Sequence, residues 1–81
     1  MASTLSATIA RNARRERAAQ QRRQVDVAEV GGISRTQLGV IESGARLLSV
    51  DDVLALCRGL HVTLADLVDG ADPGDLELLG L

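Results

Sequence analysis

One short segment of the chain concentrates hydrogen-bonding side chains at the start of a predicted helix. Arg35, Thr36 and Gln37 fill its first turn, and Ser34 can cap the N-terminus by accepting from an otherwise unpaired backbone N–H. A guanidinium can donate two hydrogen bonds to guanine, and threonine can contact a base or a thymine methyl. We therefore expect this helix tip to enter the major groove of double-stranded DNA.

The rest of that helix has the features of an anchored element. Leu38 and Ile41 are three residues apart and share one face. Gly44 stands where a left-handed glycine would end the helix. The segment over residues 34–43 is thus predicted to present a polar tip while its apolar face holds it to a core.

The other reactive side chains do not form a catalytic or metal-binding pattern. Cys57 and His61 are four residues apart, but they make half of a zinc site at most, and the chain has no further Cys or His. There is no glycine-rich phosphate loop and no nucleophile motif. We predict no enzyme activity, no catalytic residue, no metal and no cofactor.

The charge is distributed unevenly along the chain. The net charge is −2, but residues 1–46 carry eight Arg and four acidic residues, while residues 47–81 carry one Arg and seven acidic residues. This asymmetry favours one surface for a polyanion and another for water or protein. Aromatic residues are absent, which excludes the stacking platforms of single-strand readers.

The length and composition are those of one small domain. No apolar run approaches the ~20 residues that span a bilayer, and no signal peptide is evident. One cysteine fits a reducing compartment. We expect a cytoplasmic, nucleoid-associated protein that makes no membrane contact.

The hydrophobic spacing predicts helices only. A first helix to about Ala19 has Leu5, Ile9 and Ala13 as its buried stripe, and Gly31-Gly32 ends a second helix that begins at Gln24. After the helix at 34–43, Ser49 caps a fourth and Thr63 a fifth. The buried stripe predicted for the fourth consists of Val50, Val53, Leu54, Cys57 and Leu60. We assign residues 1–69 to the domain and 70–81 to a short acidic-apolar tail.

Residues 24–44 resemble the lambda-repressor-like helix-turn-helix family of XRE or Cro/repressor type. Gln24 opens the second helix, Ala28 lies at its centre, Ser34 caps the next helix, and that helix ends in Ile41-Glu42-Ser43-Gly44. The resemblance implies a five-helix, all-α DNA-binding domain with the helix-turn-helix at helices 2 and 3.

The resemblance also implies roles for individual positions. Arg35, Thr36 and Val40 would read bases, with Gln37 beside them. Phosphate contacts would come from Gln24 at the start of the second helix and from Ser43, Ala45 and Arg46 after the recognition helix. Ser34, which caps that helix, is also counted among the DNA-binding residues. Glu42 would form an internal ion pair with Arg17. The chain departs from the family at Glu16, Gln21, Arg22 and His61, where an aliphatic residue, Gly-Leu and Gly are common.

Two functions remain open from the sequence. The first is a sequence-specific transcriptional regulator, a repressor that binds a near-palindromic operator as a homodimer with half-sites about 34 Å apart. The second is an antitoxin-like or anti-regulator module, in which the acidic C-terminal half binds a protein partner through Leu76, Leu78, Leu79 and Leu81.

Overall fold

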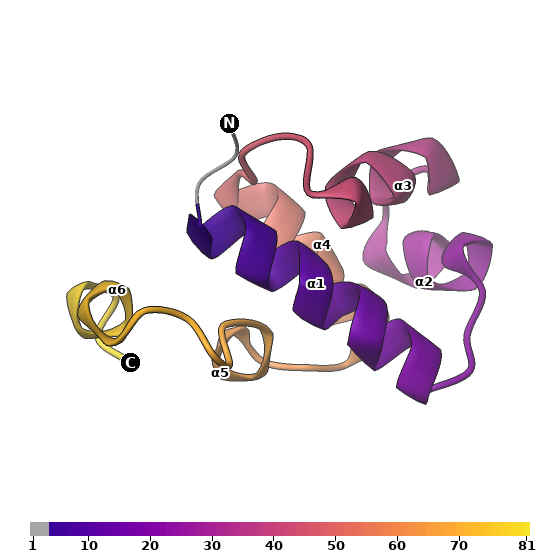
Figure 1. Cartoon of the computed structure of the whole chain (residues 1–81). Helices are drawn as coiled ribbons and strands as arrows, with labels where there is room; N and C mark the ends of the chain where they lie inside the picture. The colour runs from indigo at the N-terminus through magenta and orange to yellow at the C-terminus, as the bar shows by residue number, and fades with distance from the viewer. Residues whose placement is uncertain (1–3) are drawn as a thin grey trace.

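The computed structural model describes residues 4–81, and in that range the chain forms six helices and no strand (Figure 1). The helices are α1 (Thr4–Ala19), α2 (Gln24–Gly31), α3 (Arg35–Ser43), α4 (Val50–Leu60), α5 (Leu64–Leu67) and α6 (Pro73–Leu78). The all-α prediction is confirmed, and the first five helices lie where the sequence placed them. The difference is α6, which lies within the predicted tail.

Local capping explains where three of the helices begin. Ser34, Ser49 and Thr63 each accept a hydrogen bond from the backbone N–H three residues on, and the side chain at that position bonds back to the backbone N–H of the capping residue. Each of these reciprocal pairs satisfies two donors that the helix itself leaves unpaired. The predicted caps of α3, α4 and α5 are therefore confirmed.

The closest helix contact, between α2 and α4, depends on two glycines. A Cβ on Gly31 would lie 2.7 Å from the carbonyl oxygen of Ala55, and one on Gly59 would lie 2.6 Å from that of Val27. Both distances are far below ordinary van der Waals contact, so only glycine permits this approach.

This contact corrects the predicted face of α4. Its buried residues are Ala55, Leu56, Gly59 and Leu60, whereas Val50 is 85% exposed and Leu54 is 51% exposed. The predicted stripe is right for Leu60, which is buried, and for Val53 and Cys57, which pack against the core. It is wrong for Val50 and Leu54, because the prediction counted large apolar residues only. The small residues of α4 face α2, since they allow the two backbones to approach.

Helix α1 crosses the molecule and packs against α3 on one side and α5 on the other (Figure 1). Ile9 and Ala13 are buried as expected, and Leu5 packs against the core from its edge. Buried polar side chains on the same helix fasten distant segments. Ser6 accepts from the backbone N–H of Leu48, and Asn12 donates to the backbone carbonyls of Leu67, at the end of α5, and Asp69.

The turn between α1 and α2 differs from the family pattern in sequence, but its backbone still adopts a left-handed conformation. Gln21 adopts a left-handed backbone with φ of 55°, at the position where glycine is common. Arg22 donates to the carbonyl oxygen of Gly59 at 2.6 Å, and Gln20 donates to that of Leu60 at 2.8 Å. The turn therefore caps the C-terminal end of α4 with polar side chains, and His61 ends that helix with φ of 57°.

The last segment is a short helix with a partly unpacked apolar side. Asp72 accepts hydrogen bonds from two backbone N–H groups, and Pro73 occupies the first turn of α6. The Asp-Pro-Gly sequence that is typical of a turn therefore begins a helix here. Ala71 and Leu76 pack against the core, but Leu78 is 89% exposed. Across the described residues, none of the helices has the length and apolar character needed to cross a bilayer.

Candidate nucleic-acid interface

The outward side of α3 carries the side chains that were predicted to read DNA. Arg35, Thr36, Gln37 and Ser43 are exposed, and Val40 is 41% exposed. The opposite side of the same helix is buried. The helix therefore offers a polar surface with one apolar member, and its position is fixed from behind.

The buried side of α3 combines two aliphatic residues with a carboxylate. Leu38 and Ile41 are 1% and 0% exposed, and Glu42 is 4% exposed. Burial of an unpaired carboxylate would be strongly unfavourable. The position of α3 therefore depends on how Glu42 is satisfied.

Glu42 is held by groups from two other helices. The guanidinium of Arg17 on α1 donates through Nε at 2.8 Å and Nη2 at 2.9 Å, one bond to each carboxylate oxygen. Gln24 on α2 donates from Nε2 at 3.1 Å, and Arg14 donates to the backbone carbonyl of Glu42. The hydrogen bonds that Arg17 donates to Glu42 raise the pKa of Arg17 above its usual value. The ion pair implied by the family resemblance is thus present, and it connects α1 to α3.

This network extends to the outward surface through one residue. Gln24 accepts a hydrogen bond from Nη1 of Arg35 at 3.4 Å while it donates to Glu42. Gln24 and Arg35, predicted to contact a phosphate and a base, therefore lie side by side. Among the described residues, Arg35 has no carboxylate in ion-pair contact, so its charge is available to a polyanion.

Three further candidate residues also have structural roles. Ser34 and Gln37 form the capping box of α3, with hydrogen bonds of 3.0 and 2.9 Å. The hydroxyl of Ser43 donates to the carbonyl of Val40 and accepts from the backbone N–H of Ala45. Only the amide oxygen of Gln37 is used in the cap, so within residues 4–81 its amide N–H groups are left for an external acceptor.

Arg46 lies in the loop after α3 and is paired. Its guanidinium contacts the carboxylate of Asp52 at 2.6 and 3.3 Å and donates to the carbonyl of Leu47. The hydrogen bond from Arg46 lowers the pKa of Asp52. A phosphate that contacts Arg46 would therefore compete with the Asp52 carboxylate for the same guanidinium.

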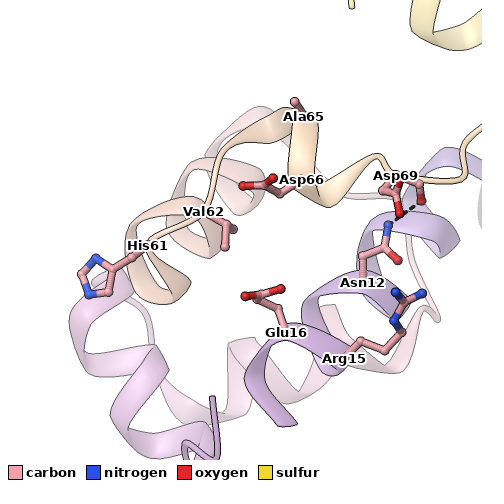
Figure 2. Close-up of a pocket in the computed structure, with 8 residues that line it drawn as sticks. All are labelled: Asn12, Arg15, Glu16, His61, Val62, Ala65, Asp66 and Asp69. Carbon is pink, nitrogen blue, oxygen red and sulfur yellow. Dashed lines mark hydrogen bonds between the residues drawn. The ribbon is translucent and has the colours of Figure 1, made fainter. Parts of the chain in front are cut away.

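The side of α1 that faces α5 carries a cleft of different character. The cleft has a volume of about 500 Å³. Figure 2 shows the side chains that line it. The carboxylates of Glu16 and Asp66 face its open centre, and Arg15 and Asp69 lie at one end, nearer Asn12 (Figure 2). Three carboxylates against one guanidinium disfavour phosphate here. Within residues 4–81, no group of three or more His, Cys, Asp or Glu side chains is arranged to hold a metal.

The sequence reasoning did not anticipate two supports of the interface. Arg14 contacts the end of α3, and its spacing of three residues from Arg17 is the one signal that places both on the same side of α1. Gln20 and Arg22 fix the turn before α2 through distant carbonyls. Periodicity carries no signal for such contacts, because the acceptors are backbone atoms about 40 residues away.

Comparison with known proteins places this arrangement in a family. A helix-turn-helix family model matches residues 14–67, which span α2, α3, α4 and α5 and the second part of α1. No curated protein sequence matches the chain.

Solved structures of the restriction-modification controller protein C.Esp1396I share the fold. One point mutant is 24% identical with a TM-score of 0.73, and the match covers 83% of this chain and 85% of that one. The wild-type protein is 23% identical with a TM-score of 0.71, covering 80% and 84%. The family match over residues 14–67 shows that the chain belongs to the lambda-repressor-like helix-turn-helix family of DNA-binding transcriptional regulators.

Proposed function

We propose that this protein is a sequence-specific transcriptional repressor that reads the major groove of double-stranded DNA with α3. The observation that carries the proposal is the two-sided character of α3. Arg35, Thr36 and Val40 are exposed, while Leu38, Ile41 and Glu42 hold the helix from behind. Repression requires only occupation of promoter DNA, which a domain of this size can provide. The place of action would be the nucleoid.

The contacts divide into base readout and phosphate positioning. Arg35 would donate both guanidinium arms to a guanine, and Thr36 and Val40 would contact neighbouring base edges. Gln24, Ser34, Ser43 and Arg46 would lie against phosphates, and Gln37 would reach a base or the backbone. The hydrogen bond between Gln24 and Arg35 supports this division, because it orients a base-reading side chain from a phosphate-facing one.

Selection of bound sites from random duplexes, followed by titration of variants against the selected operator, tests this proposal. Arg35→Ala should remove preference for the operator, whereas Arg46→Ala should weaken all duplexes similarly and reduce the salt slope by less than about 1, because Asp52 partly neutralises Arg46. Arg15→Ala is the matched control, since it removes a cation that lines the acidic cleft. If Arg35→Ala keeps the operator preference, groove reading by α3 is refuted.

We further propose that the protein binds its operator as a homodimer through the surface formed by α6 and an adjacent apolar groove. Leu78, Leu79 and Leu81 are 89%, 48% and 52% exposed. The groove beside them has a volume of about 220 Å³ and is lined mainly by Leu5, Ile9, Leu48, Val50, Val53, Leu64, Val68 and Leu79. A symmetric dimer needs a self-complementary patch, and here a projecting apolar segment and an apolar groove occur on one chain. Residues 70–81 would then be an assembly segment attached to a DNA-binding domain at 1–69.

Analytical ultracentrifugation, which measures the mass of the protein in solution, tests this second proposal. Leu78→Asp should shift the mass from dimer to monomer and weaken binding to a two-half-site operator, while binding to a single half-site stays unchanged. Glu77→Gln, at an exposed neighbour, is the control. A wild-type monomer at micromolar concentration would contradict the homodimer. That result would favour the alternative, a protein-interaction module whose acidic C-terminal half engages another protein.

A further inference from the structure

Three glycines lie inside α2, α3 and α4, and packing within the fold accounts for two of them. Added Cβ atoms on Gly31 and Gly59 would come within 2.7 and 2.6 Å of carbonyl oxygens on the facing helix. Gly39, in the middle of α3, is different. A Cβ at Gly39 would meet no atom within 4 Å.

The backbone at Gly39 gives no reason for glycine either. Its φ is not in the positive range, unlike those of Gly32 and Gly44 at the ends of α2 and α3. Glycine is the least favourable residue in a helix interior apart from proline. The recognition helix therefore carries a destabilising residue that neither packing nor backbone conformation requires.

The location of Gly39 points to a reason outside the chain. It lies one turn after Arg35, one turn before Ser43 and directly before Val40, within the surface proposed to face DNA. Glycine allows a backbone to approach a ligand more closely than any other residue does. We infer that the backbone of α3 at Gly39 comes into van der Waals contact with a base edge in the major groove.

This inference rests on the proposed function and makes Gly39 a positioning residue for it. The missing side chain would set how deeply α3 enters the groove, and therefore the distance from Arg35 and Thr36 to the bases they read. A methyl group at this position would hold the helix away from the base edge. Contacts that depend on short hydrogen bonds would be lost first, so operator binding should suffer more than non-specific binding.

The substitution Gly39→Ala tests the inference because stability and operator affinity should move in opposite directions. The melting temperature should rise by about 4–8 °C, since alanine is favourable in a helix and finds open space. Affinity for the selected operator should fall about tenfold, as expected for an overpacked contact. Affinity for an unrelated duplex should change less than about twofold, because phosphate contacts dominate it.

A control and two outcomes make the test decisive. Cys57→Ala, a helix-favouring change on the half-buried side of α4, should leave operator affinity at the wild-type value. If Gly39→Ala binds the selected operator as tightly as the wild type, or weakens both duplexes equally, the inference is overturned while the proposed function stands. If the wild-type chain selects no sequence at all, the proposed function fails and the inference fails with it.

Discussion

Removal of the Arg17 guanidinium should destabilise the fold far more than loss of an exposed ion pair would. The carboxylate of Glu42 is 5% exposed and receives two of its three hydrogen bonds from Arg17. Breaking a buried pair by removing one partner costs about 3–5 kcal/mol. Because the Arg17 side chain remains 23% exposed, and water can partly replace it, we expect the lower end of this range.

Arg17→Ala should therefore lower the free energy of unfolding by about 3 kcal/mol, which corresponds to a fall in melting temperature of about 12–24 °C for a domain of this size. Urea denaturation followed by circular dichroism at 222 nm measures it, since the chain has no tryptophan. Glu42→Gln preserves the side-chain volume and leaves the more exposed partner uncompensated, so its loss should be smaller, about 1–2 kcal/mol.

The double variant and a neighbouring arginine control the experiment. Arg17→Ala combined with Glu42→Gln should cost less than the sum of the single losses by about 1 kcal/mol or more, because the two residues share one interaction. Arg15→Ala should stay within about 0.5 kcal/mol of the wild type, as is usual for exposed positions. A loss below about 1 kcal/mol for Arg17→Ala would refute the argument, since exposed pairs fall in that range.

Three further substitutions probe other parts of the fold. Gly59→Ala should lower the free energy of unfolding by about 2–3 kcal/mol in urea denaturation, because its Cβ would stand 2.6 Å from the carbonyl of Val27; a neutral result would contradict the close α2–α4 contact. His61→Gly should raise the melting temperature by about 4–8 °C through relief of a left-handed backbone, and a fall would argue against strain there. Arg46 lowers the pKa of Asp52, so the stability supplied by this carboxylate is present above its unfolded pKa of about 4 and lost as pH falls through the folded value. The difference between wild type and Asp52→Asn should accordingly be constant near neutral pH and shrink below about pH 4, and a difference that grows on acidification would contradict this sign.

The helix boundaries could be read from the sequence because their causes are local. Ser34 and Thr63 bond to residues three positions away, so both partners of each capping box can be recognised within four consecutive residues of the sequence. Gly44 ends α3 with a positive φ of 71°, also a local requirement. The resemblance to a family added the Arg17–Glu42 pair, which local signals alone would not have supplied.

Non-local contacts explain what the sequence could not predict. The face of α4 was predicted only in part, because Ala55 and Gly59 carry little hydrophobic signal, yet they meet α2 directly. From the sequence, Asn12 would be expected on the solvent-exposed face of α1. It is buried because it donates to two backbone carbonyls that lie 55 and 57 residues away in the chain. The base and phosphate roles of the interface residues remain predictions, since they depend on a molecule outside the chain.

The separation between the two sides of α3 has a consequence for how recognition could be changed. The side chains that anchor α3 in the core are not those proposed to read bases. The two sets are connected only where Gln24 bonds to both Glu42 and Arg35, so elsewhere they can vary independently. Arg35, Thr36 and Val40 could be exchanged for other residues while the angle of the helix to the domain is retained. The domain should therefore serve as a scaffold whose target DNA sequence can be changed by substitutions at a few positions. A new side chain at position 35 would also require a compatible residue at position 24, because Arg35 donates a hydrogen bond to Gln24.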